Sequence, residues 1–387
     1  MGSPIWFTSN INKEEQMKPT GWRRQILWLA TLAMVLAACG DNGDGGAVAE
    51  DCDEVDEVTL QLQWFAQSQF AGYYVALDNG FYADQCLDVE ILEGGVDIVP
   101  QQVLATGGAE FGLAWVPKAL VSLEGGADIV NIAQVFERSG TLEVSLADSG
   151  IESPEDWAGK KVGNWGFGNE FELTAAISKF GVEDVELIGQ DFTMNALLNG
   201  DIDAAEAMIY NEYAQVLEAI NPDTGELYQP EDLNVIDFND IGTAMLQDAV
   251  WVNAEWIAQA GNEDIAVRFL TASFRGWVHC LDNFDSCVDV VLANGSTLGA
   301  GHQEWQLNEI LGLIFPATNG IGVMNTALWD QTVEIATAEI PDLQSVEISD
   351  EAYRTDLAEL AIANLSGSDT DGDGYSRRDI ELKEGGE

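Results

Sequence analysis

The strongest constraint on the fold is a regular alternation of short apolar runs and helical patterns. Strand-like runs occupy residues 58–64, 87–92, 111–115 and 129–136, and the helical patterns between them end at glycines such as Gly80 and Gly107. A glycine after a helix supplies the left-handed conformation that closes it. This rhythm predicts parallel or mixed sheets whose faces are covered by helices, which is an α/β fold.

A second set of strand and helix patterns follows between residues 140 and 248. One further strand at residues 249–252 then precedes a long, mainly helical region. We therefore predict two lobes joined by two crossings of the chain. Residues 56–139 and 249–364 form the first lobe, and residues 140–248 form the second. A ligand site in such a molecule is expected in the cleft, where the carboxyl ends of strands meet.

The N-terminal segment has the pattern of an export signal. Arg23 and Arg24 precede an apolar run at residues 26–35, and Leu36-Ala37-Ala38-Cys39 follows it. A basic region, a short apolar region and small residues before a cleavage point define a secretory signal. The tetrad resembles the lipobox of bacterial lipoproteins, so residues 1–38 are the predicted signal peptide and Cys39 the lipidated residue. Met17 offers an alternative start, in which case residues 1–16 are not translated.

Export makes disulfides the expected state of the remaining cysteines. The glycine-rich acidic stretch at residues 39–55 reads as a flexible tether, and the protein is expected outside the cytoplasm on the cell membrane. Four cysteines remain after Cys39, which allows three pairings. We predict Cys52–Cys86 and Cys280–Cys287 from their nearness in sequence, with free buried thiols as the alternative.

The charge of the chain excludes some partners. It has 67 acidic and 15 basic residues, and a mature form beginning at Cys39 has 65 against 11, a net charge of −54. Phosphate backbones and anionic membrane surfaces need basic residues to neutralise them. Nucleic acid is therefore excluded as a partner, and the membrane is expected to be contacted through the lipid anchor alone.

The acidic C-terminal tail, residues 365–387, contains a partial calcium motif. Asp369, Asp371, Asp373 and Gly374 match the first half of a calcium-binding loop, but Arg377 and Ile380 occupy two later ligand positions. A solvated tail is favoured over a weak calcium loop, and no other metal site is predicted.

No motif of an enzyme is present. The chain has two histidines, no Gly-x-Ser-x-Gly, no His-Glu-x-x-His and no Walker-type phosphate loop. Counting carboxylates leaves a general acid/base pair open, since acidic residues are abundant. We predict a protein that is not an enzyme and carries no cofactor.

Four predicted strand-end loops combine aromatic side chains with amides or carboxylates. Flat aromatic faces can sandwich a ring, and amides or carboxylates can bond its edge. Any single tryptophan is more often core, but four such loops on one face favour a ligand site. The predicted ring-stacking residues are Trp64, Trp115, Trp165 and Tyr210. The predicted edge-binding residues are Gln69, Asn169, Asn211 and Glu212, with Glu170 as second choice and Tyr73 open between site and core.

Several segments resemble a known family of solute-binding proteins. They are QWFAQSQFAGYYVALDNGF at 63–81, GGAEFG at 107–112, SPEDWAGKKVG at 153–163, AMIYNEY at 207–213 and QEWQLNE at 303–309. They resemble the binding proteins of ABC importers for thiamine pyrimidine precursors and for riboflavin. The resemblance implies a type 2 periplasmic-binding-protein fold that closes on a small aromatic heterocycle. It also implies a membrane permease and an ATPase as partners, and we expect a monomer.

Two alternatives share that fold. One is a sulfonate or nitrate binder, which the absence of lysine and arginine from the four loops disfavours. The other is an enzyme of pyrimidine-precursor synthesis, whose cysteine-rich motif is absent here. The resemblance does not separate a pyrimidine ligand from a flavin.

Overall fold

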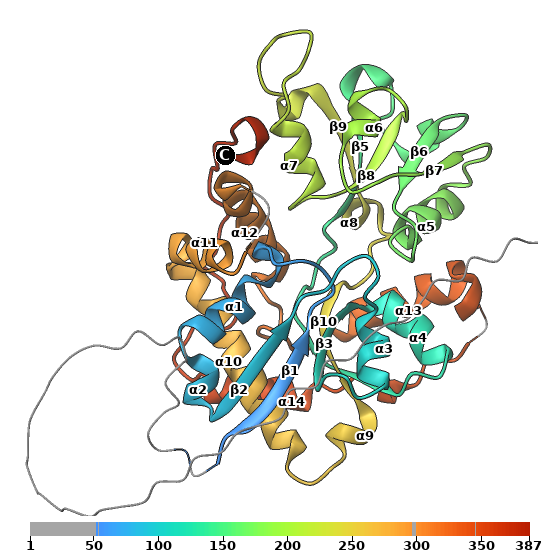
Figure 1. The fold of residues 1–387 in the computed structure, drawn as a ribbon. Helices are drawn as coiled ribbons and strands as arrows, with labels where there is room; N and C mark the ends of the chain where they lie inside the picture. Colours follow the sequence, from blue (N-terminus) through green and yellow to red (C-terminus); the bar gives the residue numbers. More distant parts are fainter. Residues whose placement is uncertain (1–51, 53, 296–298, 345) are drawn as a thin grey trace, which may run out of the picture. The chain divides into compact units, whose positions relative to one another are not determined.

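The computed structural model describes residue 52 and residues 54–295, 299–344 and 346–387 (Figure 1). The predicted signal peptide, the predicted lipidation site Cys39 and most of the predicted tether lie outside the described residues.

The first lobe is built on a five-stranded mixed sheet of order β2-β1-β3-β10-β4 (Figure 1). β1 pairs in parallel with β2 and β3, whereas β10 is antiparallel to β3 and β4. Its strands are β1 (Asp56–Gln61), β2 (Leu87–Leu92), β3 (Phe111–Trp115), β4 (Ile129–Gln134) and β10 (Asp248–Asn253).

The second lobe has a five-stranded sheet of the same kind, in the order β7-β6-β8-β5-β9. β6 is parallel to β7 and β8, and β5 is antiparallel to β8 and β9. Its strands are β5 (Thr141–Leu146), β6 (Lys161–Asn164), β7 (Glu186–Gly189), β8 (Ala204–Met208) and β9 (Leu233–Asp237). The predicted α/β fold, with two lobes and a mixed sheet in each, is confirmed.

Helices cover both sheets (Figure 1). The first lobe has α1 (Ala71–Asp78), α2 (Phe81–Asp84), α3 (Pro100–Ala105), α4 (Val116–Glu124), α9 (Ala254–Ile257), α10 (Asn262–Asp282), α11 (Phe284–Ala293), α12 (Ala300–Ile314), α13 (Thr326–Glu339) and α14 (Asp356–Asn364). The second lobe has α5 (Phe171–Phe180), α6 (Asn195–Leu198), α7 (Glu212–Leu217) and α8 (Phe238–Ile241). Within the described ranges, no helix combines the length and the apolar character needed to cross a bilayer.

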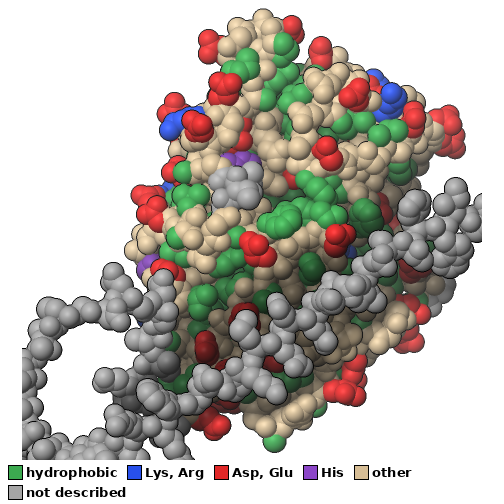
Figure 2. All heavy atoms as spheres, in the orientation of Figure 1, with side chains coloured by type: hydrophobic (Ala, Val, Ile, Leu, Met, Phe, Trp, Pro, Cys, Tyr) green, Lys and Arg blue, Asp and Glu red, His purple; other side chains and the backbone are tan. Residues whose placement is uncertain are grey.

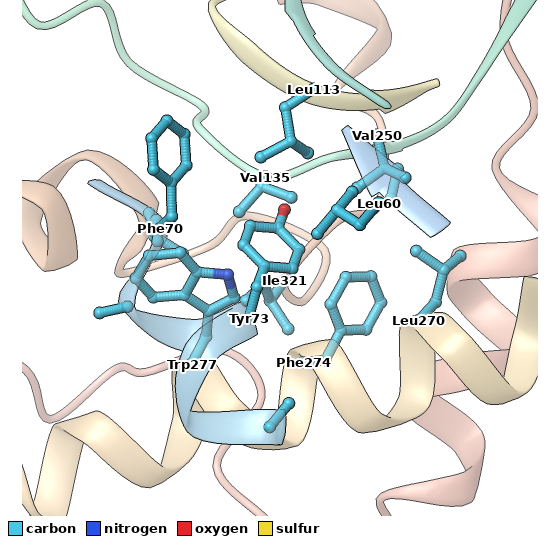
Figure 3. Close-up of a cluster of buried hydrophobic side chains, with 14 of the residues drawn as sticks. Leu60, Phe70, Tyr73, Leu113, Val135, Val250, Leu270, Phe274, Trp277 and Ile321 are labelled. Atoms are coloured by element: carbon cyan, nitrogen blue, oxygen red, sulfur yellow. The ribbon is translucent and has the colours of Figure 1, made fainter. Parts of the chain in front are cut away.

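The core of the first lobe depends on a close contact between α1 and α10. A Cβ atom on Gly276 would overlap the carbonyl of Gly72, and one on Gly72 would overlap the indole of Trp277. Trp277 is fully buried and lies in one cluster with Phe274, Leu60 and other apolar residues (Figure 3). Glycine is needed at both positions because the two helix backbones approach each other directly.

Both predicted disulfides are present. Cys52–Cys86 joins the residues before β1 to the residue before β2, and Cys280–Cys287 joins α10 to α11. Each pair has a Cα–Cα distance of 5.7 Å, which is normal for a disulfide.

The C-terminal tail is largely exposed, as expected of a solvated tail, but it also packs against both lobes. The Tyr375 hydroxyl donates to the Asn308 carbonyl at 2.6 Å, Arg377 pairs with the buried Glu309 at 2.7 Å, and Leu382 packs against the hydrophobic cluster of the second lobe. These few contact residues were not predicted because the tail was judged by its overall acidic composition.

The calcium alternative for the tail is not supported. The described part of the chain contains no group of three or more acidic, histidine or cysteine side chains arranged to hold a metal ion. Asp371 and Asp373 therefore form no such group with Asp369, whose carboxylate accepts from the backbone N–H of Gly372 at 2.9 Å.

The two segments that cross between the lobes, residues 135–140 and 242–247, are joined by one buried carboxyl group. Glu172 on α5 accepts from the Met245 N–H at 2.6 Å and from the Ser139 hydroxyl at 2.7 Å. Burial raises the pKa of Glu172 to about 8, against the hydrogen bonds that lower it. A side chain of the second lobe thus fixes both crossing segments.

Replacing Gly276 by alanine should destabilise the protein by about 1–3 kcal/mol, because the added methyl group has no space between α1 and α10. Urea unfolding followed by circular dichroism measures this change. Gly189→Ala is the matched control, since nothing lies within 4 Å of its Cβ position. Equal stability of the two variants would contradict the packing argument.

Stability should fall as the pH rises from about 4.5 to about 8. Over that range the folded protein keeps a proton on Glu172 that the unfolded chain has already released. Glu172→Gln should reduce the difference between the melting temperatures at pH 6 and pH 8, measured at constant salt. The exposed Glu155→Gln is the control, and an unchanged difference in Glu172→Gln would count against a neutral Glu172.

Candidate functional site

A cavity of about 550 Å³ lies between the two lobes, where loops following the strands converge. Its first-lobe wall includes the segments around Trp64 and Trp115, and its second-lobe wall includes those around Trp165 and Tyr210. The volume is within the usual range for a site that holds a small organic molecule.

Nine of the ten predicted site residues line this cavity. They are Trp64, Gln69, Trp115, Trp165, Asn169, Glu170, Tyr210, Asn211 and Glu212. Segments far apart in sequence therefore meet at one place, as the strand-end rule predicts. Their roles in ligand binding remain predictions.

Tyr73, the tenth residue, belongs to the core instead. It is 2% exposed, and its ring packs edge-on against Trp277 with the centroids 5.8 Å apart (Figure 3). It lies within α1 and is not among the residues that line the cavity.

A buried carboxylate, Asp248 at the start of β10, fixes three side chains of the cavity wall. One oxygen accepts from the amide groups of Gln63 at 2.8 Å and Gln69 at 2.9 Å, and the other accepts from the Trp115 indole N–H at 2.8 Å. Burial raises the pKa of Asp248 to about 6, while these hydrogen bonds lower it. Asp248 was not predicted as a site residue, because in the sequence it is only the residue that precedes the strand predicted at 249–252.

Lys118 is the single basic residue among the described residues that line the cavity. Its Nζ donates to the Asn169 side-chain oxygen of the other lobe at 2.7 Å and lies 5.0 Å from the centre of the Trp115 ring. Burial lowers the pKa of Lys118 to about 8. The four loops contain no lysine, as expected, but Lys118 reaches the cavity from the first turn of α4.

Two acidic side chains, one in the second-lobe wall and one behind it, bond the backbone of that wall. Glu206 accepts from the backbone N–H of Trp165 at 2.9 Å, and Glu212 accepts from the backbone N–H of Met208 at 3.0 Å. Burial raises the pKa of Glu206 to about 8 and that of Glu212 to about 7. Glu212 also accepts from the Asn211 amide at 2.8 Å, so part of its capacity to accept hydrogen bonds is already used within its own loop.

Two phenylalanines that the sequence did not single out complete the aromatic lining. Phe192 of the second lobe contacts Trp64 of the first, with ring centroids 4.7 Å apart. Phe167 is 88% exposed and has a positive φ of 57° between two glycines that also have positive φ. A large side chain exposed on a strained loop at a cavity is typical of a contact residue.

The cavity offers aromatic faces and a surplus of hydrogen-bond acceptors, in a protein whose surface carries mainly acidic charge (Figure 2). Its described lining includes no histidine and no cysteine. The arrangement is suited to holding a flat, uncharged or weakly cationic ring rather than an anion.

Comparison with known proteins gives one family match and two binding proteins that align with most of the chain. Residues 67–286 match a protein-family model described as NMT1/THI5 like. The chain is 25% identical over 274 residues to the formylaminopyrimidine-binding protein of Halalkalibacterium halodurans, covering 70% of this chain and 78% of that protein. It is 25% identical over 298 residues to the riboflavin-binding protein RibY of Chloroflexus aurantiacus, covering 73% and 81%.

An enzyme is also among the relatives, with an alignment that covers less of the chain. A solved structure of a binding protein has a similar fold. A 4-amino-5-hydroxymethyl-2-methylpyrimidine phosphate synthase of Aspergillus parasiticus is 25% identical over 153 residues, 38% of this chain and 45% of that protein. The alkanesulfonate-binding protein SsuA of Xanthomonas axonopodis pv. citri, bound to MOPS, superposes with a TM-score of 0.57 at 14% identity, covering 78% of this chain and 99% of that one. At that identity the likeness concerns the fold alone.

Lys118 should titrate near pH 8 because it is buried in the cavity. Nuclear magnetic resonance of 13C-labelled lysine side chains measures this, and Lys118→Arg assigns the signal by its loss. The exposed Lys161 provides the internal control. A Lys118 signal that titrates only above pH 10 would contradict the buried environment.

Proposed function

Because the chain belongs to the NMT1/THI5-like family, we propose that it is the solute-binding component of an ABC importer and binds a small heteroaromatic ring. A thiamine pyrimidine precursor and riboflavin are the two proposed ligands. Two relatives that align with most of the chain are a formylaminopyrimidine-binding protein and a riboflavin-binding protein, which supports the proposal.

The observation that carries the proposal is the cavity wall itself. Trp64 and Trp115 from one lobe, and Trp165 and Tyr210 from the other, surround a space of about 550 Å³. Amides and carboxyl groups lie between these aromatic faces, where they can bond the edge of a ring. Both lobes contribute aromatic faces and polar side chains to the wall. A flat ligand would therefore be contacted by both lobes.

An anionic ligand is less well matched. Lys118 is the lone cation among the described lining residues, and its ammonium group already bonds Asn169. Glu170 lines the same cavity and Glu206 lies directly behind it. A sulfonate buried there would lose its hydration without finding enough donors. We therefore place the sulfonate alternative below the two ring ligands.

The proposal extends to location and partners. We propose that Cys39 carries lipid and holds the protein on the outer side of the cell membrane. A permease and an ATPase would receive the ligand, and the binding protein would act as a monomer. It would release its ligand unchanged, unlike the synthases that share part of its sequence.

Tryptophan fluorescence titration with riboflavin, 4-amino-5-hydroxymethyl-2-methylpyrimidine, formylaminopyrimidine and taurine tests the proposal. Micromolar binding of a ring compound, with recovery of the same mass afterwards, is the expected result. Binding of taurine alone would favour the sulfonate alternative, and a changed mass would favour an enzyme.

Trp64→Ala should weaken binding of the ring ligand by about tenfold to a hundredfold, because stacking on one aromatic face contributes about 1–3 kcal/mol. Isothermal titration calorimetry measures the affinity. Trp256→Ala is the matched control, since Trp256 is also half-buried but does not line the cavity. Equal losses in both variants would remove Trp64 from the ligand wall.

A further inference from the structure

One side chain of the cavity wall is unlike its neighbours. Gln101 on α3 is 3% exposed and lines the cavity. Its Oε1 has no hydrogen-bond partner within the described part of the chain. No protein hydrogen bond was found for its Nε2 among the described residues either. Burial of an amide without hydrogen bonds is unfavourable, and most buried polar groups in proteins avoid it.

The other glutamines of the wall are held by protein groups. Gln63 and Gln69 donate to Asp248, and Gln67 donates to the Gln69 side-chain oxygen at 2.6 Å. These bonds fix the orientation of each amide. The Gln101 amide has no such bond, so no described protein group fixes its orientation.

The opposite lobe presents one more unused group. The indole N–H of Trp165 is buried and has no partner among the residues that the structure describes, and Trp165 lines the same cavity at 8% exposure. The backbone N–H of Trp165 is bonded to Glu206, so the residue is anchored while its indole donor remains free. Each lobe therefore has, at a residue of the cavity wall, a buried polar atom that no described protein group bonds.

We propose that Gln101 determines ligand specificity by pairing its amide with a neighbouring donor and acceptor on the edge of the ring. This inference rests on the proposed function and defines its ligand class. An amide offers one donor and one acceptor side by side, and glutamine uses this pair to recognise the amino group and ring nitrogen of adenine. Aminopyrimidines and the lactam edge of flavins carry such a pair, whereas a sulfonate carries acceptors only. Trp165 donates to a further acceptor of the same ligand.

Matched pairs of ligands test this inference in the purified full-length protein. The first pair is 4-amino-5-hydroxymethyl-2-methylpyrimidine and its analogue without the 4-amino group. The second pair is riboflavin and N3-methylriboflavin, in which the ring donor is blocked. Calorimetry should show that the wild-type protein prefers the donor-bearing member of the pair it binds by at least about tenfold.

Gln101→Leu should weaken binding of the donor-bearing ligand by about tenfold and abolish the preference between the two members. Its melting temperature without ligand should equal or exceed that of the wild type, since no protein hydrogen bond is lost. The nearly isosteric Gln101→Glu gives a second reading, because it removes the donor and keeps the shape. Gln102→Leu, at the exposed neighbouring position, should keep the wild-type preference.

The outcomes separate the two proposals. Failure of the wild-type protein to bind either ring ligand overturns the proposed function. Binding by the wild type with the preference retained in Gln101→Leu or Gln101→Glu overturns the role of Gln101 and leaves the function standing. A lower melting temperature in both variants, with the preference retained, would make Gln101 a structural residue.

Discussion

The hydrogen bonds of Asp248 connect the sheet, the crossings and the cavity. Its backbone carbonyl accepts from the N–H groups of Val135 and Phe136, where the first crossing begins. Its side chain accepts from Gln63, Gln69 and Trp115 on the cavity wall. Asp248 itself follows the second crossing directly. One buried residue thus contacts the cavity wall through its carboxyl group and the first crossing segment through its backbone carbonyl.

The abundance of acidic residues has a different meaning inside the protein than on its surface. Exposed carboxylates keep the chain soluble and repel polyanions. Burial raises the pKa values of Glu172 and Glu206 to about 8, so at neutral pH each mainly holds a proton. These buried groups therefore supply hydrogen bonds in the interior without a matching number of buried charges. Such an interior is compatible with the proposed uncharged ring ligand and matches a sulfonate poorly.

Elements that depend on local sequence pattern were predicted correctly. Contacts between segments far apart in the chain were not predicted. Strand ends carrying Trp64, Trp115 and Trp165 were predicted because periodicity locates strands, and strand ends gather at one edge of a sheet. Tyr73 was not resolved, since the same aromatic segment continues into α1 and turns toward α10. Asp248, Lys118 and Gln101 were missed because their contacts come from residues far away in the chain. The contacts of the tail were not predicted because composition alone does not show that Tyr375 and Leu382 pack against the two lobes.

The most direct measurement of the central claim is a crystal structure of the protein with the ring ligand that it binds most tightly. The account predicts that the ring lies between the aromatic walls of the two lobes, with one edge paired to the amide of Gln101 and another atom within reach of the Trp165 indole N–H. A ring bound elsewhere, or bound in the cavity with its polar edge turned away from both groups, would contradict it.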